Sequence, residues 1–122
     1  MTIKLDSSPN RRKLRQLAGV AHTRELGAGL SRLEADFATW RRGEIDPFEL
    51  SDRIHRFHDD VSRGLYALYN RLPPSQLVAR AVALQILQEA DLPAVLLEAL
   101  ERDVQYYREP LSGLDESTEP DE

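Results

Sequence analysis

The segment GEIDPFEL, which begins at Gly43, constrains the fold most, because it marks the end of one helix and the start of the next. Gly43 suits the left-handed conformation that often closes a helix. Asp46 is a favourable N-cap, Pro47 suits the first helical position, and Glu49 completes a capping box. So short a connection predicts two antiparallel helices, over about residues 9–42 and 47–72.

Apolar residues recur at alternating spacings of three and four on both predicted helices, as the facing surfaces of a helical hairpin require. On the first helix, this apolar stripe consists of Leu26, Leu30, Leu33, Phe37 and Trp40. On the second helix it consists of Leu50, Ile54, Phe57, Val61, Leu65, Leu68 and Leu72. Pairing outward from the turn sets Trp40 opposite Leu50 and brings His22 level with about Leu68.

The first half of the first helix is out of phase with this stripe. At about 100° per residue, Leu14, Leu17 and Ala21 fall on the opposite side. The phase changes near Gly27 and Gly29, each of which costs about 1 kcal/mol relative to alanine inside a helix. We expect a continuous or kinked helix whose first half packs on a second neighbour; the alternative is a break at these glycines.

The remainder of the chain predicts a shorter hairpin, over about residues 75–90 and 93–109, bounded by Pro73-Pro74 and Pro110. The expected fold is all-α, a four-helix arrangement in which the short hairpin covers the long one. We expect residues 1–8 to form a flexible leader, 9–110 a single helical domain and 111–122 an acidic disordered tail.

Composition excludes several classes of protein. The chain has no cysteine, and therefore neither disulfides nor a cysteine zinc site. It shows no secretory signal and no apolar run of about 18 residues, so we expect a cytoplasmic protein without a membrane contact. The net charge is −5, with a basic cluster at residues 11–15. Because this cluster has no aromatic residues among its charges and residues 1–110 as a whole are neutral, we do not expect nucleic acid as a partner.

A second pattern on the 47–72 helix combines serine, histidine and tyrosine. This Ser/His/Tyr seam consists of Ser51, His55, His58, Ser62, Tyr66 and Tyr69. On a regular helix it lies about 100° from the apolar stripe. Such residues are typical of a boundary layer against neighbouring helices, with their polar atoms in water. The functional alternative is a ligand pocket or a docking surface.

A metal site is one sharper hypothesis for this helix. Asp52, His55 and Asp59 are spaced so that adjacent pairs lie about one turn apart, and imidazole with carboxylate suits several divalent metals. His22 would be the next nitrogen ligand, but the predicted register places it about 15 Å along the axis from His58. One helix then supplies too few ligands, so we expect neither a metal nor another cofactor.

The sequence from Arg53 to His58, RIHRFH, resembles the Arg-x4-His motif of HEPN domains, which are helical and often dimeric ribonucleases. The resemblance implies Arg53 and His58 as a catalytic pair near the scissile phosphate. The sequence departs from the family in placing Ile54 where a polar residue is usual. On a regular helix, moreover, Arg53 and His58 point about 140° apart.

The pattern GEIDPFEL…IH.FH…LY.LY is similar to segments of small bacterial all-helical proteins without an assigned activity, over about residues 26–90. That resemblance implies a helical fold and brings no functional residues with it. The leading hypothesis is a non-catalytic helical protein that binds another protein or itself. It would use either the Ser/His/Tyr seam or the face formed by Leu14, Leu17 and Ala21. A small-molecule-binding or metal-binding bundle is a further alternative.

Overall fold

The structure is a computed structural model that describes residues 5 and 7–117, with side chains as far as Glu109. It is all-α, as predicted, and these residues contain no strand. The helical elements are α1 (Ser8–Arg41), α2 (Pro47–Arg56), the π-helical η1 (Phe57–Ser62), α3 (Arg63–Arg71), α4 (Pro74–Ala83), the 3₁₀-helical η2 (Glu89–Asp91), α5 (Ala94–Ala99) and α6 (Glu101–Ser117). Of the predicted leader, residues 1–4 and 6 lie outside the described residues.

The chain divides into two compact units that share helix α1. The hairpin unit comprises His22–Arg71, and the terminal unit comprises the described residues up to Ala21 and from Leu72 onwards. Helix α1 runs without interruption past Gly27 and Gly29, so the expected continuous helix is confirmed and the alternative break is wrong.

The turn of the hairpin unit forms as its local sequence predicts. Gly43 has a φ of +78°, and its N–H donates to the Trp40 carbonyl at 2.9 Å while the Glu44 N–H donates to the Thr39 carbonyl at 3.1 Å. These two bonds make the Schellman closure of a helix. Asp46 then caps α2 by accepting from the Glu49 N–H at 2.8 Å. In place of the predicted capping box, the Glu49 carboxylate turns to arginines further along α2.

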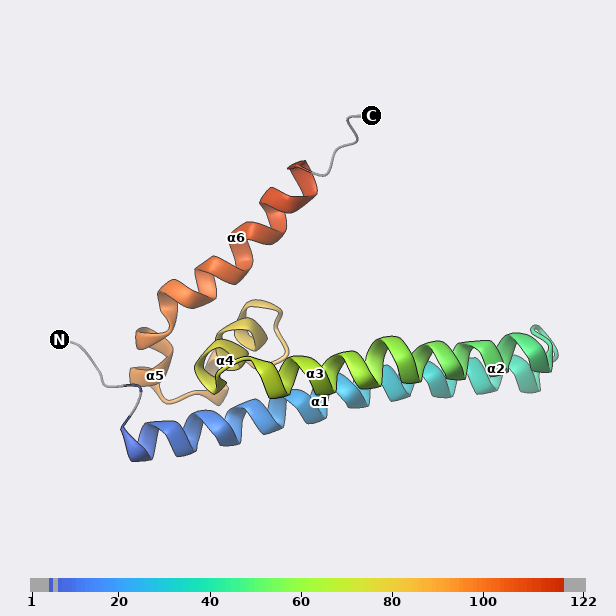
Figure 1. The fold of residues 1–122 in the computed structure, drawn as a ribbon, viewed down its shortest axis with the longest axis horizontal. Coiled ribbons are helices and arrows are strands. Elements are labelled where there is room, and N and C mark those ends of the chain that lie inside the picture. Colours follow the sequence, from blue (N-terminus) through green and yellow to red (C-terminus); the bar gives the residue numbers. More distant parts are fainter. Residues whose placement is uncertain (1–4, 6, 118–122) are drawn as a thin grey trace. The chain divides into compact units, whose positions relative to one another are not determined.

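Three pairs of residues across the hairpin agree with the predicted register. Near the turn, Arg53 on α2 donates to Asp36 on α1 at 2.9 Å. In the middle, Gly29 lies against Val61. At the far end, His22 stacks on Tyr69, one position from the predicted Leu68. Figure 1 shows the second half of α1 beside α2, η1 and α3, running in the opposite direction.

The π-helical segment η1 interrupts the second helix of the hairpin. Its end is marked by the Arg63 N–H, which donates to the His58 carbonyl five residues before it. Each such i→i+5 turn contains one residue more than an α-turn, so every later side chain is rotated by about 100° from its expected direction. A stripe of side chains that is predicted from sequence spacing on α2 therefore does not continue in the same direction on α3.

The terminal unit contains nearly all of the buried core. Its fully or almost fully buried side chains include Leu14, Leu17, Ala21, Leu77, Val78, Ala81, Val82, Leu87, Leu92, Leu96, Leu100 and Val104. The face formed by Leu14, Leu17 and Ala21 is thus part of this core, and the hypothesis that it docks a partner is wrong. The phase change along α1 reflects two different packing environments on one helix.

The predicted helix over 75–90 ends early, at Ala83. The Ile86 N–H donates to the Ala81 carbonyl at 2.8 Å and the Gln85 N–H to the Val82 carbonyl at 3.1 Å, which closes α4 with Gln85 at φ +64°. A glutamine there gives no sequence signal for the left-handed conformation, which glycine usually supplies. The reversal brings Leu87 into the core, where it is 1% exposed.

The predicted helix over 93–109 also differs from the structure. It divides at Leu100 into α5 and α6, which are joined by the bond from the Val104 N–H to the Leu100 carbonyl at 2.8 Å. Helix α6 then continues through Pro110 to Ser117, beyond the predicted boundary, because an internal proline removes one helical hydrogen bond without necessarily ending a helix. Part of the predicted tail is therefore helical, and residues 118–122 lie outside the described residues.

Candidate functional site

The hairpin unit carries a polar groove on one of its faces. Its floor is formed by Gly29, Leu33, Phe57 and Val61, and its walls by Arg32, Asp36, Arg53, Arg56 and Asp60. Its volume is about 350 Å³. Gly29 makes this close approach of α1 and η1 feasible, because a Cβ there would lie 2.9 Å from Val61 Cγ1 and 3.1 Å from Phe57 Cε1.

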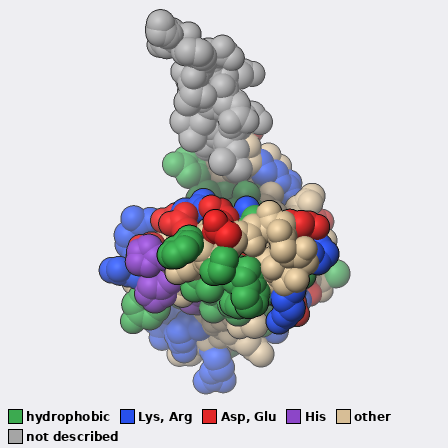
Figure 2. All heavy atoms as spheres, turned by 90° about the vertical axis from the view of Figure 1, so that its right-hand side faces the viewer, with side chains coloured by type: hydrophobic (Ala, Val, Ile, Leu, Met, Phe, Trp, Pro, Cys, Tyr) green, Lys and Arg blue, Asp and Glu red, His purple; other side chains and the backbone are tan. Residues whose placement is uncertain are grey.

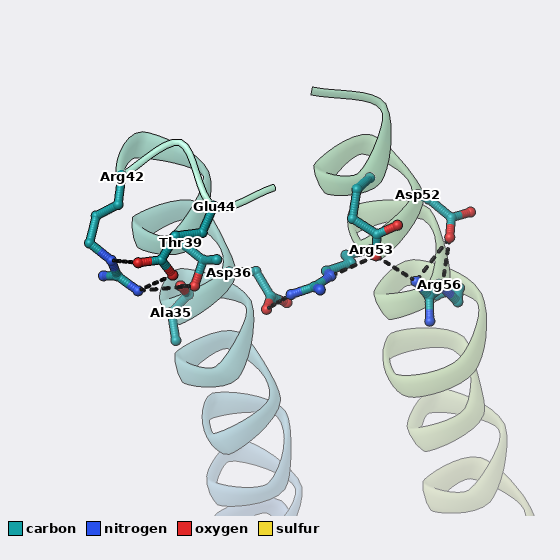
Figure 3. A network of polar contacts seen from close by, with 9 residues as sticks. Ala35, Asp36, Thr39, Arg42, Glu44, Asp52, Arg53 and Arg56 are labelled. Carbon is teal, nitrogen blue, oxygen red and sulfur yellow. Dashed lines mark hydrogen bonds and ion pairs between the residues drawn. The ribbon is translucent and has the colours of Figure 1, made fainter. Parts of the chain in front are cut away.

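Ion pairs fill the turn end of the groove, as Figure 3 shows. Arg53 donates from Nε to Glu49 at 2.8 Å and from Nη1 to Asp36 at 2.9 Å. Hydrogen bonds to Glu49 and then Asp36 raise the pKa of the Arg53 guanidinium above its ordinary value. Arg56 reaches Asp52 at 2.9 Å and Glu49 at 3.4 Å. This network fixes α2 against α1 and leaves the groove with compensated charge.

Nearer the turn, a separate cluster holds the exposed end of α1, also visible in Figure 3. Arg42 forms two bonds to the Glu44 carboxylate, at 3.0 and 3.2 Å. Thr39 accepts from Arg42 at 3.4 Å and donates to the Ala35 carbonyl at 3.0 Å. The bonded guanidinium lowers the pKa of Glu44, and the carboxylate raises that of Arg42. These contacts are local and support the turn.

The hairpin unit also exposes apolar side chains outside the groove. Leu30 and Ile54 each lie two positions before an arginine that lines the groove, Arg32 and Arg56 respectively. Each also lies three positions before a residue of the groove floor, Leu33 and Phe57 respectively, so Leu30 and Ile54 lie beside that floor but outside the groove. They remain 48% and 39% exposed, although both belong to the predicted apolar stripe.

The apolar surface continues to the turn end of the hairpin. Trp40 is 38% exposed and Phe48, in the first turn of α2, is 85% exposed. Figure 2 looks onto this end and shows hydrophobic side chains grouped in its middle, with charged side chains around them and histidines to one side. Leu26, Leu33 and Phe37 are half-buried. Among the large apolar side chains that the structure describes between positions 22 and 71, only Leu50 is buried.

The Ser/His/Tyr seam does not form one surface. Ser51, His55, His58 and Tyr66 are exposed, so they are not a boundary layer, whereas Ser62 and Tyr69 are half-buried. Tyr66 and Tyr69 both follow η1, and of the two it is Tyr69 that faces α1. There its ring stacks on His22 with centroids 4.4 Å apart, and its hydroxyl donates to Glu25 at 2.7 Å.

The residues of the ribonuclease hypothesis lie in different surroundings. Arg53 is held by two carboxylates, which compensate the positive charge that would attract a phosphate. His58 is exposed and does not line the groove that contains Arg53. Their convergence on one substrate atom stays a prediction, and these contacts do not favour it.

The residues of the metal hypothesis are divided between two ion pairs. His55 Nε2 lies 3.1 Å from Asp59, while Asp52 is paired with Arg56. Within the described part of the chain, no group of three or more histidine, aspartate or glutamate residues is arranged to hold a metal ion.

The terminal unit has a second hollow, of about 320 Å³, in which Glu89, Glu98 and Glu101 lie with Arg108.

In the part of the chain described here, no helix combines the length and apolar character needed to cross a membrane. Comparison of the chain with protein-family models, curated proteins and solved structures finds no match to any of them.

Proposed function

We propose that the protein acts by binding other protein surfaces through the apolar face of its hairpin unit, and not by catalysis. We define this face by Leu30, Phe37, Trp40 and Ile54. The observation that carries the proposal is the contrast between the two units. Of the buried large apolar side chains in the described residues, all but Leu50 belong to the terminal unit, although that unit also exposes Leu84, Val95 and Tyr106. The hairpin unit leaves Leu30, Trp40 and Ile54 about two-fifths to one-half exposed.

The exposure follows from the architecture of two helices. Within the hairpin unit itself, two helices leave the outer half of an apolar stripe uncovered, so apolar side chains of that unit are exposed. Scattered apolar residues on a protein surface are ordinary, but Leu30 and Trp40 belong to the apolar stripe of α1 and Ile54 to the facing stripe of α2. Contiguous stripes of this kind are typical of surfaces that pack on another helix.

The polar groove supports a different role, that of positioning the hairpin. Its arginines and carboxylates already bind one another, and Arg53 connects α1 with α2 directly. A rigid hairpin lowers the entropy cost of binding, because less side-chain and backbone freedom is lost when a partner docks. By joining α1 and α2, the ion pairs of the groove thus hold the apolar face in a fixed conformation for binding. The cytoplasmic setting expected from the sequence stays a prediction.

Position-specific photo-crosslinking tests the proposal. Ala28 and Leu30 flank Gly29 on α1, project about 100° to either side of it, and are both exposed. A photoreactive residue at position 30, introduced in the cells that produce the protein, should form defined protein adducts that the same residue at position 28 does not form. Ile54→Glu on the neighbouring helix should abolish those adducts. Equal crosslinking from both positions, or none from either, would contradict the proposal.

A further inference from the structure

Two charged residues of the polar groove stand outside its network of ion pairs. Arg32 on α1 and Asp60 on η1 both line the groove, and neither side chain forms an ion pair or a hydrogen bond with any residue that the structure describes. The other charged residues of the lining, Asp36, Arg53 and Arg56, are bound to one another or to carboxylates of α2. The groove therefore keeps one positive and one negative group available for a ligand.

These two groups lie on opposite walls of the groove, beyond the ion pair that joins the helices. Arg32 comes one turn before Asp36 on α1, and Asp36 is bound to Arg53. On the second helix, Asp60 comes about two turns after Arg53, within the π-helical η1. Between the two walls lies the apolar floor of the groove, which includes the Phe57 ring. Helical segments of the π type are rare and occur frequently at functional sites.

We infer that this groove binds a small zwitterion, which has a carboxylate for Arg32, an ammonium group for Asp60 and an apolar body for the floor. A guanidinium is complementary to a carboxylate in charge and in the direction of its hydrogen bonds, and a carboxylate accepts from an ammonium group. A ligand with a single charge would leave one of the two residues without a partner. The groove volume, about 350 Å³, lies in the range of small-molecule sites. A short peptide with free ends and apolar side chains has this chemistry.

The ligand site is separate from the apolar face on which the proposed function rests. The groove and that face have no residue in common. A result against the zwitterion therefore leaves the proposed function standing, and a failure of the crosslinking experiment leaves the ligand site standing.

Isothermal titration calorimetry of the full chain with the dipeptide leucyl-leucine tests the inference. We expect saturable binding of one dipeptide per chain. N-acetyl-leucyl-leucine lacks the ammonium group and leucyl-leucinamide lacks the carboxylate, so each should bind at least about tenfold more weakly through the loss of one charged hydrogen bond. Absence of leucyl-leucine binding at millimolar concentrations, or equal binding of all three ligands, overturns the inference. These comparisons require no variant of the chain.

Two variants assign each charge of the ligand to its residue. Arg32→Gln should weaken leucyl-leucine binding about tenfold and leave leucyl-leucinamide binding within about twofold, because that amide has no carboxylate to lose. Asp60→Asn should act in the same way on leucyl-leucine and N-acetyl-leucyl-leucine. The control is Asp59→Asn, at a neighbouring carboxylate that is paired with His55 and does not line the groove; it should leave leucyl-leucine binding within about twofold. Equal weakening by Asp60→Asn and Asp59→Asn, or unchanged binding in Arg32→Gln, contradicts the site.

Discussion

Replacement of Gly29 by alanine tests how closely the two helices of the hairpin approach. In a helix interior, alanine is more favourable than glycine by about 0.8–1.0 kcal/mol. A Cβ at position 29, however, would lie 2.9 Å from Val61 Cγ1 and 3.1 Å from Phe57 Cε1, closer than carbon atoms pack. Overpacking of this kind costs about 1–3 kcal/mol. We therefore expect Gly29→Ala to lower the free energy of unfolding by about 0–2 kcal/mol.

Gly27 supplies a matched control two positions away on the same helix. A Cβ there meets no atom within 4 Å, so Gly27→Ala should gain most of the helical preference and raise the free energy of unfolding by about 0.5–1 kcal/mol. The two substitutions are chemically identical and differ only in their surroundings. Their effects should differ by about 1–3 kcal/mol, the cost of overpacking alone.

Urea unfolding followed by tryptophan fluorescence measures this difference in the relevant unit, because Trp40 is the only tryptophan of the chain and lies in the hairpin unit. Val61→Ala should remove the closest contact, so that Gly29→Ala is less destabilising in that background by about 1 kcal/mol. If Gly29→Ala stabilises the protein as much as Gly27→Ala does, then η1 does not approach α1 at this position and the argument for the groove floor fails.

Three further predictions concern single contacts. Asp36→Asn should lower the free energy of unfolding by about 0.5–1.5 kcal/mol, because its bond to Arg53 joins two helices and is partly shielded. Asp52→Asn, in a more exposed pair on one helix, should change the free energy of unfolding by less than about 0.5 kcal/mol. Urea unfolding of the two variants compares these effects. Asp46→Ala should lower the free energy of unfolding by about 1 kcal/mol through loss of the N-cap bond. Asp46→Asn keeps an acceptor and should retain most of that stabilisation. A similar loss of stability in both variants would contradict the role of Asp46 as a cap. The pKa of Tyr107 is raised, chiefly by burial and also by neighbouring groups, so the unfolded chain loses this phenolic proton at a lower pH than the folded chain does. The free energy of unfolding should therefore decline as the pH rises above the ordinary pKa of tyrosine. This decline should be smaller in Tyr107→Phe.

The parts of the fold that follow from sequence are those determined by neighbouring residues. Gly43 and Asp46 act within one turn of the chain, so the end of α1 and the start of α2 were predictable from residue type alone. The register followed from counting outward from that turn, and the stack of His22 on Tyr69 lies within one residue of it.

The parts that the sequence did not predict depend on contacts between distant residues. Gln85 adopts a left-handed conformation because the chain reverses to bury Leu87, and no local signal announces such a turn. The π-helical segment is equally hidden, because its apolar residues Phe57 and Val61 keep an ordinary helical spacing of four. As a result, the Ser/His/Tyr seam was predicted as one surface although the structure divides it.

The π-helical segment also connects the groove with the apolar face. Phe57 and Val61, both in η1, approach α1 at Gly29. Beyond them the extra residue turns Tyr69 inward to His22, which gives the far end of the hairpin an aromatic contact that the regular stripe would have made with leucine. Before η1 the stripe remains in phase, and there Leu30 and Ile54 stay exposed outside the groove. Deletion of one residue within 57–62 would remove the extra residue together with the π-helical turn, so it should leave Tyr69 stacked on His22 and Ile54 where it is.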